Sequence, residues 1–149
     1  GRLWDMGRPG LYRYARGLMA LEQDDHKTAE KALAAAAALL PDQLFAQLEA
    51  ARFYWTRPDV SVQYYRRAVR TPDCNAETWA ELAGALQLAD DIDGAIEAMC
   101  KAISLNPENL EAYLGMIEGL GIIIKSSIKS KIESNLCILM LFAFKNALF

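Results

Sequence analysis

Apolar and small residues in the segment 76–109 recur three or four positions apart, which is the period of one face of an α-helix. The pattern is interrupted once, by the acidic pair Asp90-Asp91. Carboxylates just ahead of a helix accept free backbone amide hydrogens and favour its positive dipole end, so the pair is predicted to cap a second helix. Pro107 then closes the segment, because proline clashes with a helix that it would continue. The segment is predicted to form a hairpin of two helices.

The same pattern occurs twice more, upstream of this segment. Residues 10–43 again span 34 positions and carry Asp24-Asp25 at the predicted turn. Residues 44–75 follow the pattern provided that two residues are missing from the turn between the helices. Small residues at equivalent places let crossing helices approach closely, and stacked copies cover the apolar face that a single hairpin leaves exposed. The residues predicted to pack within and between copies are Gly17, Ala29, Ala36, Ala51, Ala68, Trp79, Ala83, Ala95, Ala102 and Pro107.

The segment 76–109 closely resembles the tetratricopeptide repeat, a family with a 34-residue period and an aromatic-leucine-small pattern in the first helix of each repeat. The resemblance extends over residues 10–120 as about three and a half copies, and the last copy, 110–120, is partial. One departure is Arg13, which stands at the place that Trp79 occupies in the clearest copy. The resemblance implies an all-α fold, a right-handed α-solenoid of antiparallel helix hairpins.

Both ends of the chain fall outside the repeat pattern. Residues 1–9 are interpreted as a linker or the end of a preceding repeat, so we expect a fragment of a longer array, and no signal peptide is recognised there. Residues 121–149 shift in composition and carry 4 basic and 1 acidic side chains, a net charge of +3. This tail is interpreted as a helix that caps the open end of the stack, as a self-associating element, or as a segment from an alternative reading or splice of the coding sequence. Its apolar run 136–144 is well short of the roughly 20 residues that span a bilayer, so membrane contact is not expected.

Composition and charge remove several classes of function. The chain has a net charge of -3, and residues 1–120 carry 12 basic and 18 acidic side chains, a net of -6, so nucleic acid is not an expected partner. Three cysteines without a CxxC pair predict neither a disulfide framework nor a zinc site, and they favour a reducing compartment such as the cytoplasm. The single histidine, His26, is interpreted as a solvated turn residue. No catalytic residue, metal site, cofactor or small-molecule substrate is predicted.

In the tetratricopeptide family the first helix of each repeat lines a concave groove, which usually holds an extended segment or a helix of another protein. Carried onto this chain, the groove places are interpreted as a partner-binding site, because rigid aromatic side chains carry binding energy and an arginine can fix a carboxylate or carbonyl. The alternative is that the aromatic residues only pack between copies. The predicted groove residues are Tyr14, Leu18, Phe45, Glu49, Arg52, Trp55, Glu81 and Leu114.

One subclass of the family clamps the C-terminal carboxylate of its partner with lysines and asparagines, and these residues are missing here. Glu49 and Glu81 stand at two of those places, so we expect an apolar or basic partner segment, chosen by charge complementarity. The predicted function is a protein-interaction scaffold without catalysis. Two alternatives stay open: the repeats are the accessory part of a larger enzyme, such as a glycosyltransferase or sulfotransferase, or the tail makes the chain a membrane-associated or self-associating adaptor.

Overall fold

The computed structural model describes residues 8–109, which fall into two compact units divided between Cys74 and Asn75. The predictions for residues 1–7, for the partial copy 110–120 with Leu114, and for the tail 121–149 lie outside the described residues. Within the described part, no helix is both long enough and apolar enough to cross a membrane.

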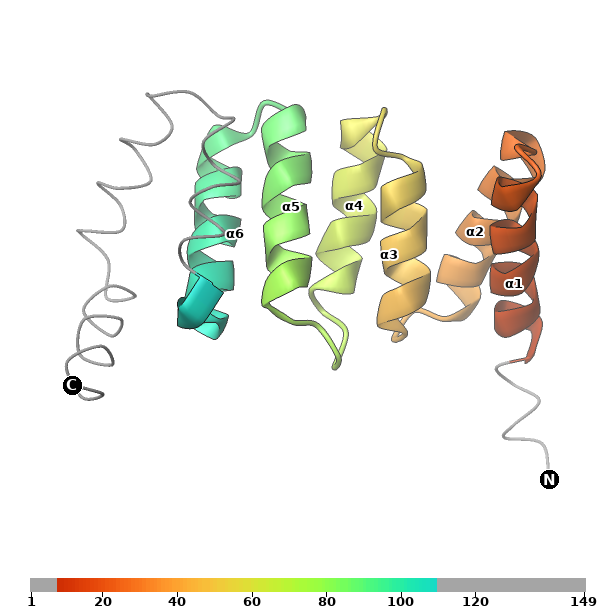
Figure 1. The fold of residues 1–149 in the computed structure, drawn as a ribbon, viewed down its shortest axis with the longest axis horizontal. Helices are drawn as coiled ribbons and strands as arrows, with labels where there is room; N and C mark the ends of the chain where they lie inside the picture. The colour runs from red at the N-terminus through yellow and green to blue at the C-terminus, as the bar shows by residue number, and fades with distance from the viewer. Residues whose placement is uncertain (1–7, 110–149) are drawn as a thin grey trace. The chain divides into compact units, whose positions relative to one another are not determined.

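Each of the three predicted copies that the structure describes forms a pair of neighbouring helices (Figure 1). In the first unit these are α1 (Arg8–Glu22) with α2 (His26–Leu39), and α3 (Leu44–Phe53) with α4 (Pro58–Ala68). In the second unit α5 (Ala76–Leu88) pairs with α6 (Ile92–Leu105), and the short 3-10 helix η1 (Pro107–Asn109) follows. No strand occurs between residues 8 and 109. The predicted all-α fold of helix hairpins is confirmed.

Two of the three turns between paired helices are built in the same way, from two consecutive aspartates. The first aspartate of each pair, Asp24 or Asp90, takes a positive φ of 55° or 65°, the left-handed conformation that ends a helix. The second accepts a hydrogen bond from a backbone amide of the next helix, at 3.1 Å from Thr28 N to Asp25 and 3.0 Å from Gly94 N to Asp91. The prediction that the acidic pairs cap the second helices is confirmed, and only the second acid of each pair is the cap.

The two helices of the first hairpin cross at a glycine. A Cβ atom added to Gly17 would lie 2.6 Å from Cδ2 of Leu33, a separation that real Cβ atoms do not show. Leu33 is 1% exposed, so it has little room to move away. Gly17 is therefore required by the close approach of α1 to α2. The predicted packing residues that are buried in the described helices are Gly17, Ala29, Ala36, Ala51, Ala68, Ala83, Ala95 and Ala102, whereas Trp79 and Pro107 are half-buried.

The second hairpin is the shortened copy, and the shortening lies in its helices. α3 has 10 residues where α5 has 13, while the turn 54–57 is one residue longer than the turn 89–91. The three residues missing from α3 and the one added to the turn account for the two residues that the sequence pattern lacks, so the prediction that they are missing from the turn is wrong. At the helix crossing Ser61 replaces alanine, and its buried hydroxyl donates to the carbonyl oxygen of Ala51 at 2.8 Å. That bond satisfies a polar group that would otherwise be costly to bury.

A glutamine joins the two hairpins of the first unit. Gln47 of α3 is 0% exposed, and its Nε2 donates to the carbonyl oxygens of Ala37 at 2.8 Å and Leu40 at 3.1 Å. These carbonyls belong to the end of α2, where the helix leaves carbonyl groups without intrahelical partners. The side chain thus caps α2 from the neighbouring hairpin and fixes the contact between α2 and α3.

The second unit packs α5 against α6 around an aliphatic core that includes Ile96 at 2% and Ile103 at 1% exposure. Its first helix begins with a capping box: Asn75 accepts from Thr78 N at 3.0 Å, and the Thr78 hydroxyl lies 3.5 Å from Asn75 N. Reciprocal bonds of this kind satisfy the free amides at a helix start.

Candidate peptide-binding site

The first helices of the two N-terminal hairpins meet through an aromatic pair. The rings of Tyr14 on α1 and Phe45 on α3 lie edge to face, with centroids 4.8 Å apart and an interplanar angle of 65°. Edge-to-face contacts at this distance stabilise aromatic pairs beyond the area that they bury. Both side chains are half-buried, so each packs between hairpins and still presents part of its surface to solvent. Packing between copies and contact with a partner are therefore compatible roles for Tyr14 and Phe45.

A charged pair lies next to the aromatic rings. Arg52 and Glu49, three residues apart on α3, are 3.6 Å from guanidinium nitrogen to carboxylate oxygen. Burial raises the pKa of the Tyr14 phenol, the Glu49 charge raises it further, and the Arg52 charge opposes that effect. Leu18 is half-buried one helical turn beyond Tyr14. The structure thus brings four predicted groove residues together on one face of α1 and α3, hereafter the α1–α3 face: Tyr14, Phe45, Glu49 and Arg52.

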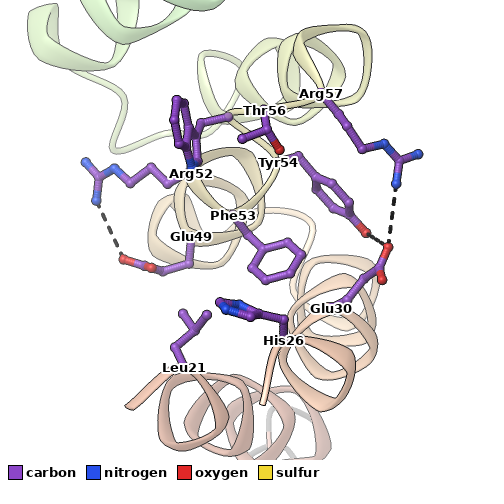
Figure 2. Close-up of a pocket in the computed structure, with 10 residues that line it drawn as sticks. Leu21, His26, Glu30, Glu49, Arg52, Phe53, Tyr54, Thr56 and Arg57 are labelled. Carbon is purple, nitrogen blue, oxygen red and sulfur yellow. Dashed lines mark hydrogen bonds and ion pairs between the residues drawn. The ribbon is translucent and has the colours of Figure 1, made fainter. Parts of the chain in front are cut away.

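A pocket of about 550 Å³ opens between the first two hairpins, at the ends that carry their turns. Figure 2 shows Leu21, His26 and Phe53 converging on it from α1, α2 and α3. The rings of His26 and Phe53 have centroids 6.5 Å apart. Trp55 also lines the pocket while 68% exposed. The lining residues are Leu21, His26, Glu30, Glu49, Arg52, Phe53, Tyr54, Trp55, Thr56 and Arg57.

One edge of the pocket is held by a polar network around Tyr54, the first residue after α3. Its hydroxyl donates to Oε1 of Glu30 on α2 at 3.0 Å, and Arg57 lies 3.8 Å from the same oxygen (Figure 2). The Tyr54 ring stacks on Tyr64 of α4 with centroids 5.7 Å apart and planes 1° from parallel. Burial and the hydrogen bond to Glu30 raise the pKa of Tyr54 to about 12. This network fixes the longer turn, residues 54–57, against both α2 and α4.

Sequence reasoning found only part of this pocket. It identified Glu49, Arg52 and Trp55, because these lie at first-helix places of the repeat, and it missed the residues that come from the second helix and from the turn. His26, interpreted as a solvated turn residue, is exposed, begins α2 and lines the pocket. The run Phe53-Tyr54-Trp55 next to the shortened helix was a usable signal, since such a concentration of aromatic residues in a turn needs a packing or binding reason.

None of the other predicted groove residues that the structure describes lines the pocket. Glu81 is half-buried on α5, in the second unit, and Leu114 lies outside the described residues. Within residues 8–109 no group of three or more histidine, cysteine, aspartate or glutamate side chains could hold a metal ion. Cys74 is half-buried and Cys100 is buried, and neither is in a disulfide.

Comparison with known proteins finds one matching family model and a solved structure of similar fold. Residues 76–109 match the family model of the tetratricopeptide repeat. The solved structure titled "Crystal structure of MamA protein" superposes with a TM-score of 0.65 at 21% sequence identity, over 94% of this chain and 84% of that one, which shows a shared fold. No curated protein sequence matches the chain. Residues 76–109 are thus similar to a tetratricopeptide repeat, and the chain shares its fold with that solved structure.

Proposed function

We propose that this chain is a non-catalytic protein-interaction scaffold, and that the α1–α3 face binds an extended segment of a partner protein. The observation that carries the proposal is the cluster of Tyr14, Phe45, Glu49 and Arg52, which two separate hairpins bring together beside an open pocket. The matched repeat supports the general role, because tetratricopeptide repeats are generally scaffolds without catalysis.

The chemistry of the face indicates the kind of segment that it would accept. Half-buried aromatic rings offer large contact area with few rotatable bonds, so they lose little entropy when a partner covers them. While it stays paired with Arg52, Glu49 has a second oxygen that can accept from a basic side chain, and the guanidinium of Arg52 has further N–H groups that can donate to a backbone carbonyl of the bound segment. An apolar segment with basic residues is the best match to this arrangement.

The test is an affinity capture from lysate with the full chain, comparing the wild type with a Tyr14→Ala, Arg52→Ala double variant. A matched control carries Tyr12→Ala and Arg13→Ala, which removes the same residue types from the same unit. Tyr12 is 63% exposed and Arg13 is exposed, and neither is among the predicted groove residues. Circular dichroism must first show that both variants keep their helical content.

The expected result is a set of captured proteins that the control retains and the Tyr14→Ala, Arg52→Ala variant loses. A tenfold loss of affinity corresponds to about 1.4 kcal/mol of binding free energy, which exceeds the roughly 1 kcal/mol that most truncated interface residues do not reach. If both variants capture the same proteins in the same amounts, the α1–α3 face is not the binding site.

A further inference from the structure

We propose that the pocket between the first two hairpins accepts an uncharged aromatic side chain of the partner segment as its anchor. The proposal rests on the proposed function, in that the anchor belongs to a bound protein segment. It adds the location of the anchor, the class of side chain and the residues that select it.

The size and lining of the pocket fit such an anchor. Its volume of about 550 Å³ lies within the roughly 300–1,000 Å³ of pockets that bury organic ligands. Leu21, His26 and Phe53 converge from three helices to form an apolar and aromatic centre (Figure 2). Trp55 is 68% exposed, so a ring inserted beside it would remove apolar surface from water on both partners. Buried aromatic anchors of this kind dominate many protein interfaces.

The charges around the pocket argue against a charged anchor. On one side Glu49 lies 3.6 Å from Arg52, and on the other side Glu30 lies 3.8 Å from Arg57 and accepts the Tyr54 hydroxyl at 3.0 Å. Figure 2 shows these two pairs flanking the centre formed by Phe53 and His26. The lining carries two carboxylates and two guanidiniums, and each carboxylate already has a cationic neighbour. A lysine or glutamate in the pocket would lose hydration and compete with one of these pairs, whereas an uncharged ring leaves both intact.

The α1–α3 face and the pocket adjoin each other and share two residues. Glu49 and Arg52 belong to both, because they flank the Tyr14 and Phe45 pair and also line the pocket. A segment lying on the face would therefore reach the pocket within a few residues. This continuity separates two tasks: the face contacts the backbone and basic side chains of the segment, and the pocket selects its anchor.

The experiment titrates the full chain with four blocked tripeptides, acetyl-Gly-X-Gly-amide, in which X is tryptophan, leucine, lysine or glutamate. Binding is followed by the amide signals of His26, Phe53 and Thr56 in two-dimensional NMR spectra. We expect saturable shifts with the tryptophan peptide and an affinity at least about tenfold above that of the lysine and glutamate peptides. Raising the salt concentration should change this affinity by less than about twofold, because an uncharged anchor is not screened.

A Trp55→Ala variant should weaken binding of the tryptophan peptide by about tenfold, as expected when an aromatic contact residue of an anchor is truncated. Tyr12→Ala is the matched control, since Tyr12 is 63% exposed on α1 and does not line the pocket. That control should bind like the wild type. Because both changed residues are largely exposed, neither variant is expected to unfold.

Three results would overturn the inference: a leucine, lysine or glutamate peptide that binds as tightly as the tryptophan peptide, the absence of saturable shifts, or an unchanged affinity in Trp55→Ala. These results are distinct from failure of the proposed function. If the tryptophan peptide binds as expected but the Tyr14→Ala, Arg52→Ala variant captures every partner, the pocket is an anchor site and the α1–α3 face is not the groove. If captures are lost but no tripeptide binds, the face is used and the anchor pocket is rejected.

Discussion

The turns of the two N-terminal hairpins are stabilised by different interactions, one by its backbone conformation and a helix cap, the other by a side chain. The turn between α1 and α2 is defined by its backbone, with Asp24 in the left-handed conformation and Asp25 capping the next helix. The turn between α3 and α4 has no side-chain cap at Arg57, and its shape is set by the side chain of Tyr54. The turn between α3 and α4 is one residue longer than the turn between α1 and α2, and its exposed Trp55 lines the pocket. The shortened helix α3 is thus followed by a turn whose residues line the pocket proposed as the anchor site.

The turn between α5 and α6 repeats the first kind. Asp90 and Asp91 take the same conformations and make the same cap as the first pair. Neither of these two turns, 23–25 and 89–91, contains an aromatic residue. Among the described hairpins, the one that departs from the repeat pattern is the one that carries the candidate anchor site.

The largest expected effect breaks the side-chain turn. Tyr54→Ala removes a buried ring that stacks on Tyr64 and donates to Glu30, so it should lower the free energy of unfolding by about 3 kcal/mol. Trp55→Ala, at the neighbouring exposed position, should change it by less than about 0.5 kcal/mol. Urea denaturation followed by circular dichroism measures both. Equal losses in the two variants would show that Trp55 is structural and not free for a partner.

The next effect is the response of the same turn to high pH. The pKa of Tyr54 is raised from 10.0 to about 12 in the folded state, so its contribution to stability is fully present below pH 10 and is lost as the pH rises through about 12. A Tyr54→Phe variant cannot ionise there and should lose less stability over this interval. Thermal unfolding of both proteins between pH 9 and about 12 gives the comparison. Parallel declines would mean that Tyr54 does not couple the turn to pH.

The backbone-defined hairpin can be broken at its helix crossing. Gly17→Ala places a Cβ against the buried Leu33 and should destabilise the protein by about 1–3 kcal/mol, the usual cost of overpacking. Gly84→Ala is the opposite control, because nothing lies within 4 Å of the added Cβ on α5. That change should stabilise by about 0.5–1 kcal/mol, since alanine favours a helix interior over glycine. Denaturant midpoints of the two variants should therefore move in opposite directions, and a shared direction would contradict the close approach at Gly17.

The smallest effect tests the cap itself. Asp91→Ala removes the carboxylate that accepts from Gly94 N and should cost about 1 kcal/mol of stability. Asp93→Ala, at an exposed position in the first turn of the same helix, removes the same charge without removing the cap and should cost roughly 0.3 kcal/mol through the helix dipole. Thermal denaturation distinguishes the two. Equal losses would indicate that charge alone, and not the hydrogen bond, holds the turn.

Local sequence was enough to predict the repeated elements. Spacings of three and four residues, paired aspartates and proline after the second helix are local signals, because helix periodicity, capping and termination depend on residues only a few positions apart. The all-α hairpin fold and the caps at Asp25 and Asp91 were predicted in this way. The groove residues Tyr14, Phe45, Glu49 and Arg52 were predicted from equivalent places in the repeat, and their role in binding stays a prediction.

Tertiary packing decided the rest, because it joins residues that no local pattern relates. Gln47 occupies a place that an aromatic residue holds in the clearest repeat, and only the contact with α2 shows that it caps the carbonyls of Ala37 and Leu40. Tyr54 and Glu30 are 24 residues apart in the chain and meet through a single hydrogen bond. The sequence by itself determined which segments become helices and where they turn. The pocket forms where the turn 54–57, which follows the shortened helix α3, contacts α2 of the neighbouring hairpin. The energy of that contact depends on both segments and is not encoded in either one alone.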